Sequence, residues 1–158
     1  LKVYLETSFF SECCTIRTGE IARGRRAVSL NWWENQARNF EFYVSGEVVR
    51  ELSSPDFPAA VRNPASMMLA GLGILPPNTE VAEFAKYLVA ERVMPGPELS
   101  GDAIHMAMAV VHELDFLLTW NQKHLANPRK RTHLLIVCAR AGLRMPTIVT
   151  PDLMNLEG

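Results

Sequence analysis

Residues 99–124, LSGDAIHMAMAVVHELDFLLTWNQKH, decide the fold of this chain. The acid Asp102 begins a segment that is apolar on nearly every side, which predicts a buried helix. A short turn at residues 113–115 follows, and then an apolar run at residues 116–119, which predicts a strand. We expect this strand to bring Asn121 to the same end of the sheet at which the helix begins with Asp102.

The size and composition of the chain fit one globular domain, which we expect residues 1–158 to form. The net charge of −1 means that the molecule as a whole does not attract nucleic acid, so any basic surface must be local. Cys13, Cys14 and Cys138 are odd in number and form no C-x-x-C pair, which favours reduced thiols and a cytoplasmic location. The chain opens on a strand-like segment and has no apolar run of about 18 residues. We therefore expect neither a signal peptide nor a membrane span.

Strand-like segments alternate with helical ones along the chain. The expected strands lie at Lys2–Leu5 and at residues 40–44, 74–75, 116–119 and 147–150. The expected helices lie at residues 20–39, 64–72, 81–92 and 134–141, besides the helix from Asp102 and one that Ser45 is expected to cap. Such alternation predicts an α/β fold with a mainly parallel central sheet of about five strands.

Oxygen-bearing side chains follow several of these strands. Glu6 follows the first strand, Glu51 lies on the helix after the second, and Asp102 and Asn121 flank the fourth. Functional groups of open parallel sheets gather beyond the carboxyl ends of the strands, so we expect these side chains to converge. Their oxygens suit Mg²⁺ or Mn²⁺, and a cation relieves the repulsion between carboxylates. Glu47 competes with Glu51, although a role at its helix N-terminus also explains it.

Each of these residues also has a purely structural interpretation. Asp102 in a first helical turn complements the helix dipole, Glu51 on a helix surface is ordinarily solvated, and Glu6 could end its strand at the surface. Asn121 is a common turn residue. His105, one turn after Asp102, is expected to be a hydrogen-bonded core histidine, with contact to a phosphate or to a ligand as the alternative. The joint placement after successive strands is what favours a site.

Basic residues form two local clusters. Arg129, Lys130 and Arg131 come shortly after Asn121, which makes them the better candidates for contacts with nucleic-acid phosphates. The other cluster is the arginine-rich segment at residues 23–26. For both clusters the structural alternative is a solvated face.

Four short segments occur in a set order along nearly the whole chain. They are YLETS at residues 4–8, SGEVVREL at 45–52, DAIHMA at 102–107 and LLTWNQKHL at 117–125. Together they resemble PIN-domain nucleases, and most closely the VapC-type toxins of toxin–antitoxin pairs. Each segment alone is a weak signal, but four in order are fairly specific. The resemblance implies a three-layer, Rossmann-like domain that cleaves RNA with Mg²⁺ or Mn²⁺.

The resemblance also assigns roles to individual residues. The implied catalytic and metal-binding residues are Glu6, Glu51, Asp102 and Asn121. Ser8 and Thr119 match the hydroxyl positions that support these groups. Glu6 and Asn121 stand where the family usually has aspartate.

From these observations we expect a metal-dependent endoribonuclease that cleaves RNA phosphodiester bonds with metal-activated water. The resemblance further implies the toxin of a toxin–antitoxin pair, an antitoxin partner and a homodimer. We expect Arg129, Lys130 and Arg131 to bind RNA. The alternative is a catalytically degenerate PIN-like module that binds RNA or a protein partner without cleavage.

Overall fold

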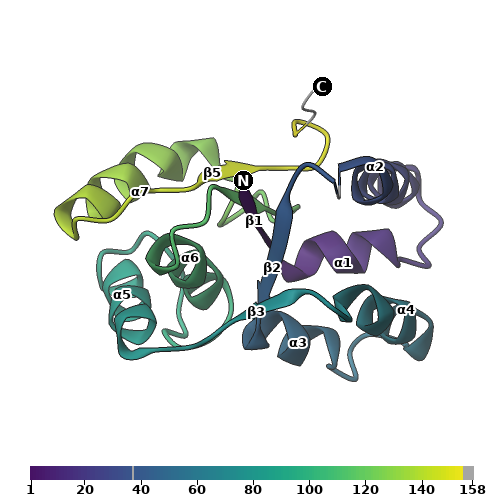
Figure 1. The fold of residues 1–158 in the computed structure, drawn as a ribbon, viewed down its shortest axis with the longest axis horizontal. Helices are drawn as coiled ribbons and strands as arrows, with labels where there is room; N and C mark the ends of the chain where they lie inside the picture. The colour runs from purple at the N-terminus through teal and green to yellow at the C-terminus, as the bar shows by residue number, and fades with distance from the viewer. Residues whose placement is uncertain (37, 155–158) are drawn as a thin grey trace.

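The computed structural model describes residues 1–36 and 38–154 and contains a five-stranded parallel sheet with the order β3-β2-β1-β4-β5 (Figure 1). Its strands are β1 (Lys2–Leu5), β2 (Glu41–Ser45), β3 (Gly73–Leu75), β4 (Phe116–Leu118) and β5 (Thr147–Val149). This arrangement confirms the predicted fold class.

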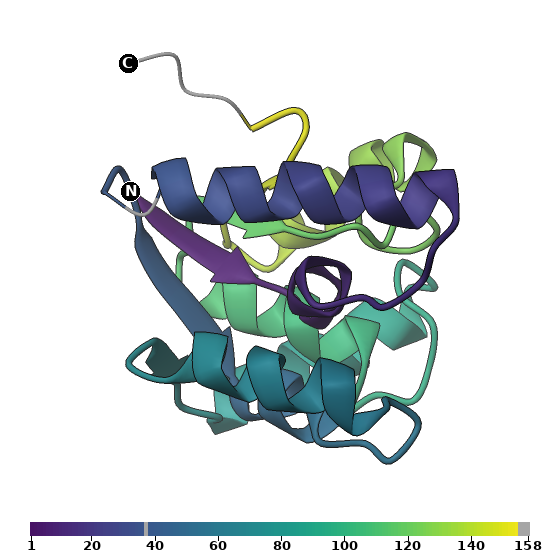
Figure 2. The same ribbon diagram turned by 90° about the vertical axis from the view of Figure 1, so that its right-hand side faces the viewer.

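Helices cover both faces of the sheet, which gives three layers. In chain order they are α1 (Thr7–Cys13), α2 (Glu20–Gln36), α3 (Gly46–Leu52), α4 (Ala59–Leu69), α5 (Thr79–Ala90), α6 (Asp102–Val111) and α7 (Pro128–Arg140). Helices α1, α2 and α4 lie on one face of the sheet, while α5, α6 and α7 lie on the other (Figures 1 and 2).

The order of the strands creates a switch point next to β1. The chain moves from β1 outward to β2 and β3, and then crosses back to place β4 on the other side of β1. The connections from β1 to β2 and from β2 to β3 therefore cover one face of the sheet. Those from β3 to β4 and from β4 to β5 cover the opposite face. Leu5 pairs with Leu118 in register, so the residues that follow β1 and β4 emerge side by side. Open α/β sheets bind ligands at such a point.

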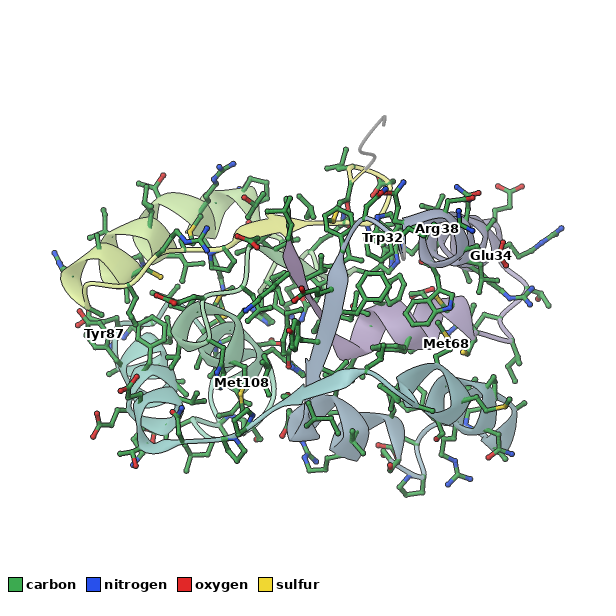
Figure 3. All side chains as sticks on the ribbon, viewed as in Figure 1. Trp32, Glu34, Arg38, Met68, Tyr87 and Met108 are labelled. Atoms are coloured by element: carbon green, nitrogen blue, oxygen red, sulfur yellow. The ribbon has the colours of Figure 1, made fainter. Side chains whose placement is uncertain are left out.

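The core explains why these segments fold as they do. Val3, Tyr4 and Leu5 of β1 are fully buried, as expected for a central strand that is covered on both faces. Residues 103–110 of α6 are buried without a break, which fits the prediction of a helix that is apolar on nearly every side. On the opposite face, Trp32 (labelled in Figure 3) packs against Phe9 and Phe42, and its indole N–H donates to the carbonyl of Met154 at 2.9 Å.

Three local features differ from the sequence-based expectation. Helix α1 was not predicted, because it is only seven residues long and its first turn depends on a cap from Glu6. Helix α7 begins at Pro128 rather than at residue 134, because the Asn127 side chain caps it and proline fits its first turn. Helix α4 begins at Ala59, and Pro64 lies inside it rather than at its start.

The remaining helices and strands match the predicted ones to within a few residues. No helix in the described ranges is long and apolar enough to cross a membrane.

Candidate functional site

Glu6 is the first acid beyond the central strand, and it is held rigidly. Its side chain caps α1 by accepting the backbone N–H of Ser8 at 3.0 Å. The same oxygen, Oε2, accepts hydrogen bonds from the hydroxyls of Ser8 and Thr119, the latter at 2.7 Å. Glu6 is 5% exposed. Because every one of these donors reaches Oε2, the other oxygen of the carboxylate is left to face the site.

The loop after β4 is fastened to the same two hydroxyls. The backbone N–H of Trp120 donates to the Ser8 hydroxyl at 2.8 Å, and that of Asn121 donates to the Thr119 hydroxyl at 2.9 Å. Each hydroxyl therefore accepts from the loop and donates to Glu6. The two bridging hydroxyls therefore hold the chain in place at the carboxyl ends of β1 and β4.

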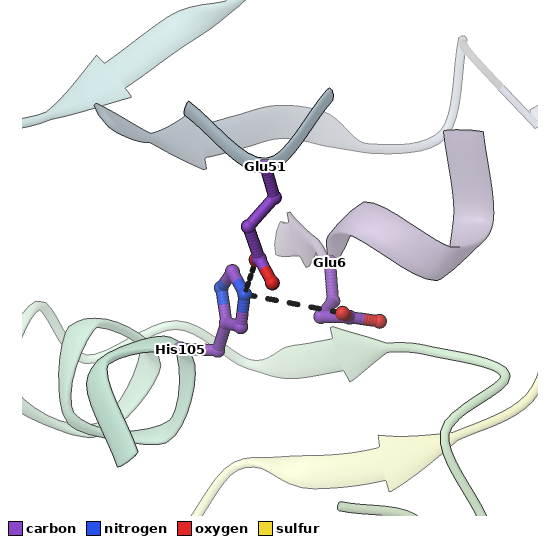
Figure 4. Close-up of side chains that lie close together, drawn as sticks. All are labelled: Glu6, Glu51 and His105. Carbon is purple, nitrogen blue, oxygen red and sulfur yellow. Dashed lines mark hydrogen bonds and ion pairs between the residues drawn. The ribbon is translucent and has the colours of Figure 1, made fainter. Parts of the chain in front are cut away.

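Glu51 reaches the site from α3 and meets His105 of α6 (Figure 4). Its Oε1 accepts hydrogen bonds from the Thr7 hydroxyl at 2.7 Å and from Nε2 of His105. Nε2 of His105 also lies 3.9 Å from Oε1 of Glu6. Glu6, Glu51 and His105 thus bring potential ligand atoms within 4.8 Å of one another, a spacing compatible with a metal ion.

The buried side of His105 faces a short polar chain inside the protein. Its Nδ1 lies 2.7 Å from the Tyr4 hydroxyl, which lies 2.7 Å from the Ser45 hydroxyl. Ser45 occupies the N-cap position of α3, as predicted, but its hydroxyl serves Tyr4 and makes no capping hydrogen bond. Both ring nitrogens of His105 are therefore occupied, one by Tyr4 and the other by Glu51.

Asp102 and Asn121 form a second pair next to the first group. The amide nitrogen of Asn121 donates to Oδ1 of Asp102 at 3.0 Å, and its carbonyl oxygen accepts the backbone N–H of His124 at 3.0 Å. A backbone N–H can only donate and a carboxylate can only accept, so these two partners fix the orientation of the amide. The predicted carbonyl ligand is thus turned toward the His124 N–H, and Asp102 lies outside the three-residue group.

Taken together, the three acids share one arrangement. Each carboxylate is anchored through one oxygen: Glu6 through Oε2, Glu51 through Oε1 and Asp102 through Oδ1. The second oxygen of each carboxylate makes no hydrogen bond to any residue in the described ranges. An anchored carboxylate with one free oxygen is pre-oriented to coordinate a cation.

Electrostatics couple the acids to His105. Burial raises the pKa of Glu51, but the hydrogen bond and the charge of His105 outweigh burial, so this pKa lies below its ordinary value. Burial lowers the pKa of His105, but Glu51 and Glu6 outweigh burial and leave this pKa raised. The pKa of Asp102 is raised by burial, against the nearby positive charges of His105 and His124. The pair of Glu51 and His105 therefore favours protonated His105 beside ionised Glu51.

These shifts predict how stability depends on pH in metal-free protein. A raised histidine pKa contributes stability that is complete below its ordinary value of about 6.5 and is lost as pH rises through the folded-state pKa. The lowered pKa of Glu51 removes its contribution only at acid pH, below its ordinary value of about 4.5. We expect the free energy of unfolding, measured with urea, to fall between pH 6 and pH 9. In His105→Gln this alkaline slope should be shallower, and equal slopes would show that His105 stays neutral.

Sequence reasoning named Ser8 and Thr119 as supports of the acids, and both hydroxyls donate to Glu6. It did not single out Thr7 or Tyr4, although Tyr4 is the one residue with a polar group in the buried part of β1, Val3–Leu5. His105 is buried and hydrogen-bonded, as expected. Its partner Glu51 belongs to the group formed by Glu6, Glu51 and Asp102, which we call the acid cluster. Glu47 pairs with Arg50 and accepts the backbone N–H of Gly101 at 3.1 Å, so it holds the start of α6.

Known proteins resemble this chain in structure rather than in sequence. No family model and no curated protein matches the sequence. The fold is PIN-like: a parallel sheet in the order 3-2-1-4-5 with an acidic cluster at its switch point. Among solved structures, the chain matches the crystal structure of VapBC2 from Rickettsia felis bound to a DNA fragment from their promoter, with a TM-score of 0.60. The match covers 95% of this chain and 98% of that chain at 14% identity, a level that establishes the fold alone.

Proposed function

We propose that this protein is a metal-dependent endoribonuclease. The observation that supports it best is the set of three carboxylates, Glu6, Glu51 and Asp102, each anchored through one oxygen while the other accepts no hydrogen bond from the described residues. They lie beyond the carboxyl ends of β1 and β4, where folds of this type bind ligands. The PIN-like fold adds support by analogy.

The donor set fits a hard divalent cation, Mg²⁺ or Mn²⁺. Carboxylate oxygens are the ligands that such ions prefer. His105 is close enough to be counted as a ligand, but both of its nitrogens already have partners. We therefore assign His105 to positioning Glu51 and balancing its charge. A divalent cation held by Glu6, Glu51 and Asp102 would supply Lewis-acid activation of water and would offset the charge that develops on a phosphoryl group.

The chain's own residues would orient the acids toward that cation. Ser8 and Thr119 hold Glu6, and Thr7 holds Glu51. We now place Asn121 in the site as the residue that positions Asp102, because its carbonyl oxygen accepts the N–H of His124.

Arg129, Lys130 and Arg131 are the proposed phosphate contacts. They lie in the first turn of α7, shortly after the loop that carries Asn121. The arginine and lysine ion pairs of residues 1–36 and 38–154 involve Arg25, Arg50 and Arg144, so these three cations have no carboxylate partner there. Positive charges without an internal partner are free to bind phosphate.

The biological setting proposed here rests on analogy. VapBC2 was crystallised bound to a DNA fragment from its promoter. By likeness of fold and of sequence motifs, we propose that this chain acts as a cytoplasmic toxin, pairs with an antitoxin and forms a homodimer.

Replacing Asp102 with asparagine tests the proposed reaction. We expect RNA cleavage to fall by about a hundredfold or more, because the substitution removes a ligand charge. We also expect the metal-free variant to be at least as stable as the wild type at neutral pH, because burial raises the pKa of Asp102 and the ionised carboxylate therefore carries a cost. Cleavage of a single-stranded RNA with Mn²⁺, and urea unfolding with EDTA, measure the two effects. Wild-type cleavage by the variant would contradict the assignment, while RNA binding by a wild type that never cleaves would indicate a binding module.

A further inference from the structure

A cavity of about 420 Å³ lies between the start of α7, strand β5 and the loop that follows Asn121, and Gln122, the next residue of that loop, lines it. Its lining includes the apolar side chains of Met94, Leu125, Leu134 and Met145. The volume is within the range of small-ligand sites, which are mostly apolar with a few placed polar groups. Apart from Lys130 and Arg131, no residue of its lining has a part in the function proposed above.

The rim of the cavity is cationic. Lys130 and Arg131 both line it, and neither has a carboxylate partner among the described residues. Positive charges at a helix N-terminus also oppose the helix dipole, so they do not serve the stability of α7. Nζ of Lys130 lies 3.1 Å from Nδ1 of His124, and the N–H of His124 donates to Asn121. The rim is thus linked to Asp102 through His124 and Asn121.

Two polar side chains are available to a ligand, one in the wall of the cavity and one at its edge. Thr150 lines the cavity and is 4% exposed, and its hydroxyl makes no hydrogen bond to another residue in the described ranges. The amide oxygen of Gln122 accepts from Arg25 at 3.4 Å, which leaves its NH₂ group as a donor at the cavity edge. A hydroxyl and an amide beside apolar side chains are suited to form hydrogen bonds with the polar atoms at the edge of a flat ring.

We propose that this cavity binds the base and ribose of one RNA nucleotide, with the phosphate of that nucleotide on Lys130 and Arg131. The inference rests on the proposed function for its choice of RNA, and it adds a subsite that selects the sequence to be cut. An acidic peptide segment would also meet the cationic rim. The observations favour a nucleotide, because the cavity is compact, joins a cationic rim to a few polar groups and is linked to Asp102 through His124 and Asn121.

Filling the cavity tests the proposal without requiring metal or cleavage. Ala126 lines the cavity, and its only hydrogen bond among the described residues is from its backbone N–H to the carbonyl of Asn121, so Ala126→Phe fills the space and keeps that bond. In EDTA, we expect the variant to bind a short fluorescein-labelled single-stranded RNA about tenfold more weakly, as measured by anisotropy. The matched control is Ala139→Phe, on the exposed side of α7 and away from the cavity, which should bind like the wild type.

Competition identifies the ligand. We expect at least one of the four nucleoside 5′-monophosphates to displace the labelled RNA from the wild type at a lower concentration than inorganic phosphate does. Equal displacement by phosphate and by all four nucleotides, or unchanged RNA binding by Ala126→Phe, would overturn the proposal. Displacement by an acidic apolar peptide but by no nucleotide would overturn it in favour of a protein segment.

A second variant covers the case in which Ala126→Phe fails to fold. Thr150→Val keeps the shape of the side chain and removes the hydroxyl, so we expect it to reduce the preference among the four nucleotides, whereas Thr132→Val on the exposed face of α7 should not. An unchanged preference in Thr150→Val would contradict the assignment. Every measurement here is of binding in EDTA, so it does not depend on cleavage. If the protein selects nucleotides but never cleaves RNA, the nucleotide site is supported and only the proposed nuclease activity is refuted.

Discussion

Glu51→Gln is expected to reduce metal-dependent RNA cleavage by about a hundredfold or more and to abolish stabilisation by Mn²⁺. Glutamine has the size of glutamate, and its carbonyl oxygen can still accept from Thr7 and His105. The substitution therefore removes a charge and changes little else. Cleavage of single-stranded RNA and thermal unfolding with and without Mn²⁺ are the measurements.

Glu47→Gln provides the matched control for this prediction. Glu47 lies one turn earlier on α3, pairs with Arg50 and accepts the N–H of Gly101. We expect this variant to keep its metal response and most of its activity, because the Glu47 carboxylate is engaged by Arg50 and by the N–H of Gly101 and supports the start of α6. A reversed result, with Glu47 essential and Glu51 dispensable, would show that the site uses the other acid.

His105→Ala is expected to lower the free energy of unfolding of the metal-free protein by about 3–5 kcal/mol. The side chain is fully buried, so its loss opens a cavity. Its loss also leaves the Tyr4 hydroxyl without one partner and brings Glu6 and Glu51 together with no positive group between them. Urea unfolding in EDTA at neutral pH measures the effect.

His112→Ala, at the C-cap of α6, is the control. His112 is half-buried, and among the described residues its side chain makes one hydrogen bond, to the carbonyl of Pro76 at 2.8 Å. We expect a loss of about 1 kcal/mol from that single bond. Similar losses in the two variants would mean that the acid cluster does not depend on His105 for its charge balance.

The sequence predicts which residues form the site, but not how the strands that carry them are ordered in the sheet. Strand ends, helix starts and polar residues can be identified from local patterns, which placed Glu6, Glu51, Asp102 and Asn121 at one edge of the sheet. The pairing of β1 with β4 depends on the strand order, which no local pattern contains. The contact between Glu6 and Thr119 depends on that order, and here the resemblance to a family supplied what periodicity could not.

The buried supports were harder to predict because they join residues far apart in the chain. Tyr4 and His105 are 101 residues apart, and each is explained locally as part of a core strand or a core helix. We propose a positioning role for Asn121 in place of the expected ligand role, because an amide has two different ends. Only the positions of the His124 N–H and the Asp102 carboxylate decide which end faces the site.

Calorimetric titration of Mn²⁺ into metal-free protein is the most direct test of the central claim that three anchored carboxylates form a cation site. We predict saturable binding at one weak site, lost in Glu51→Gln and Asp102→Asn and retained in Glu47→Gln. Absence of binding to the wild type, or equal binding to all four proteins, would contradict the claim.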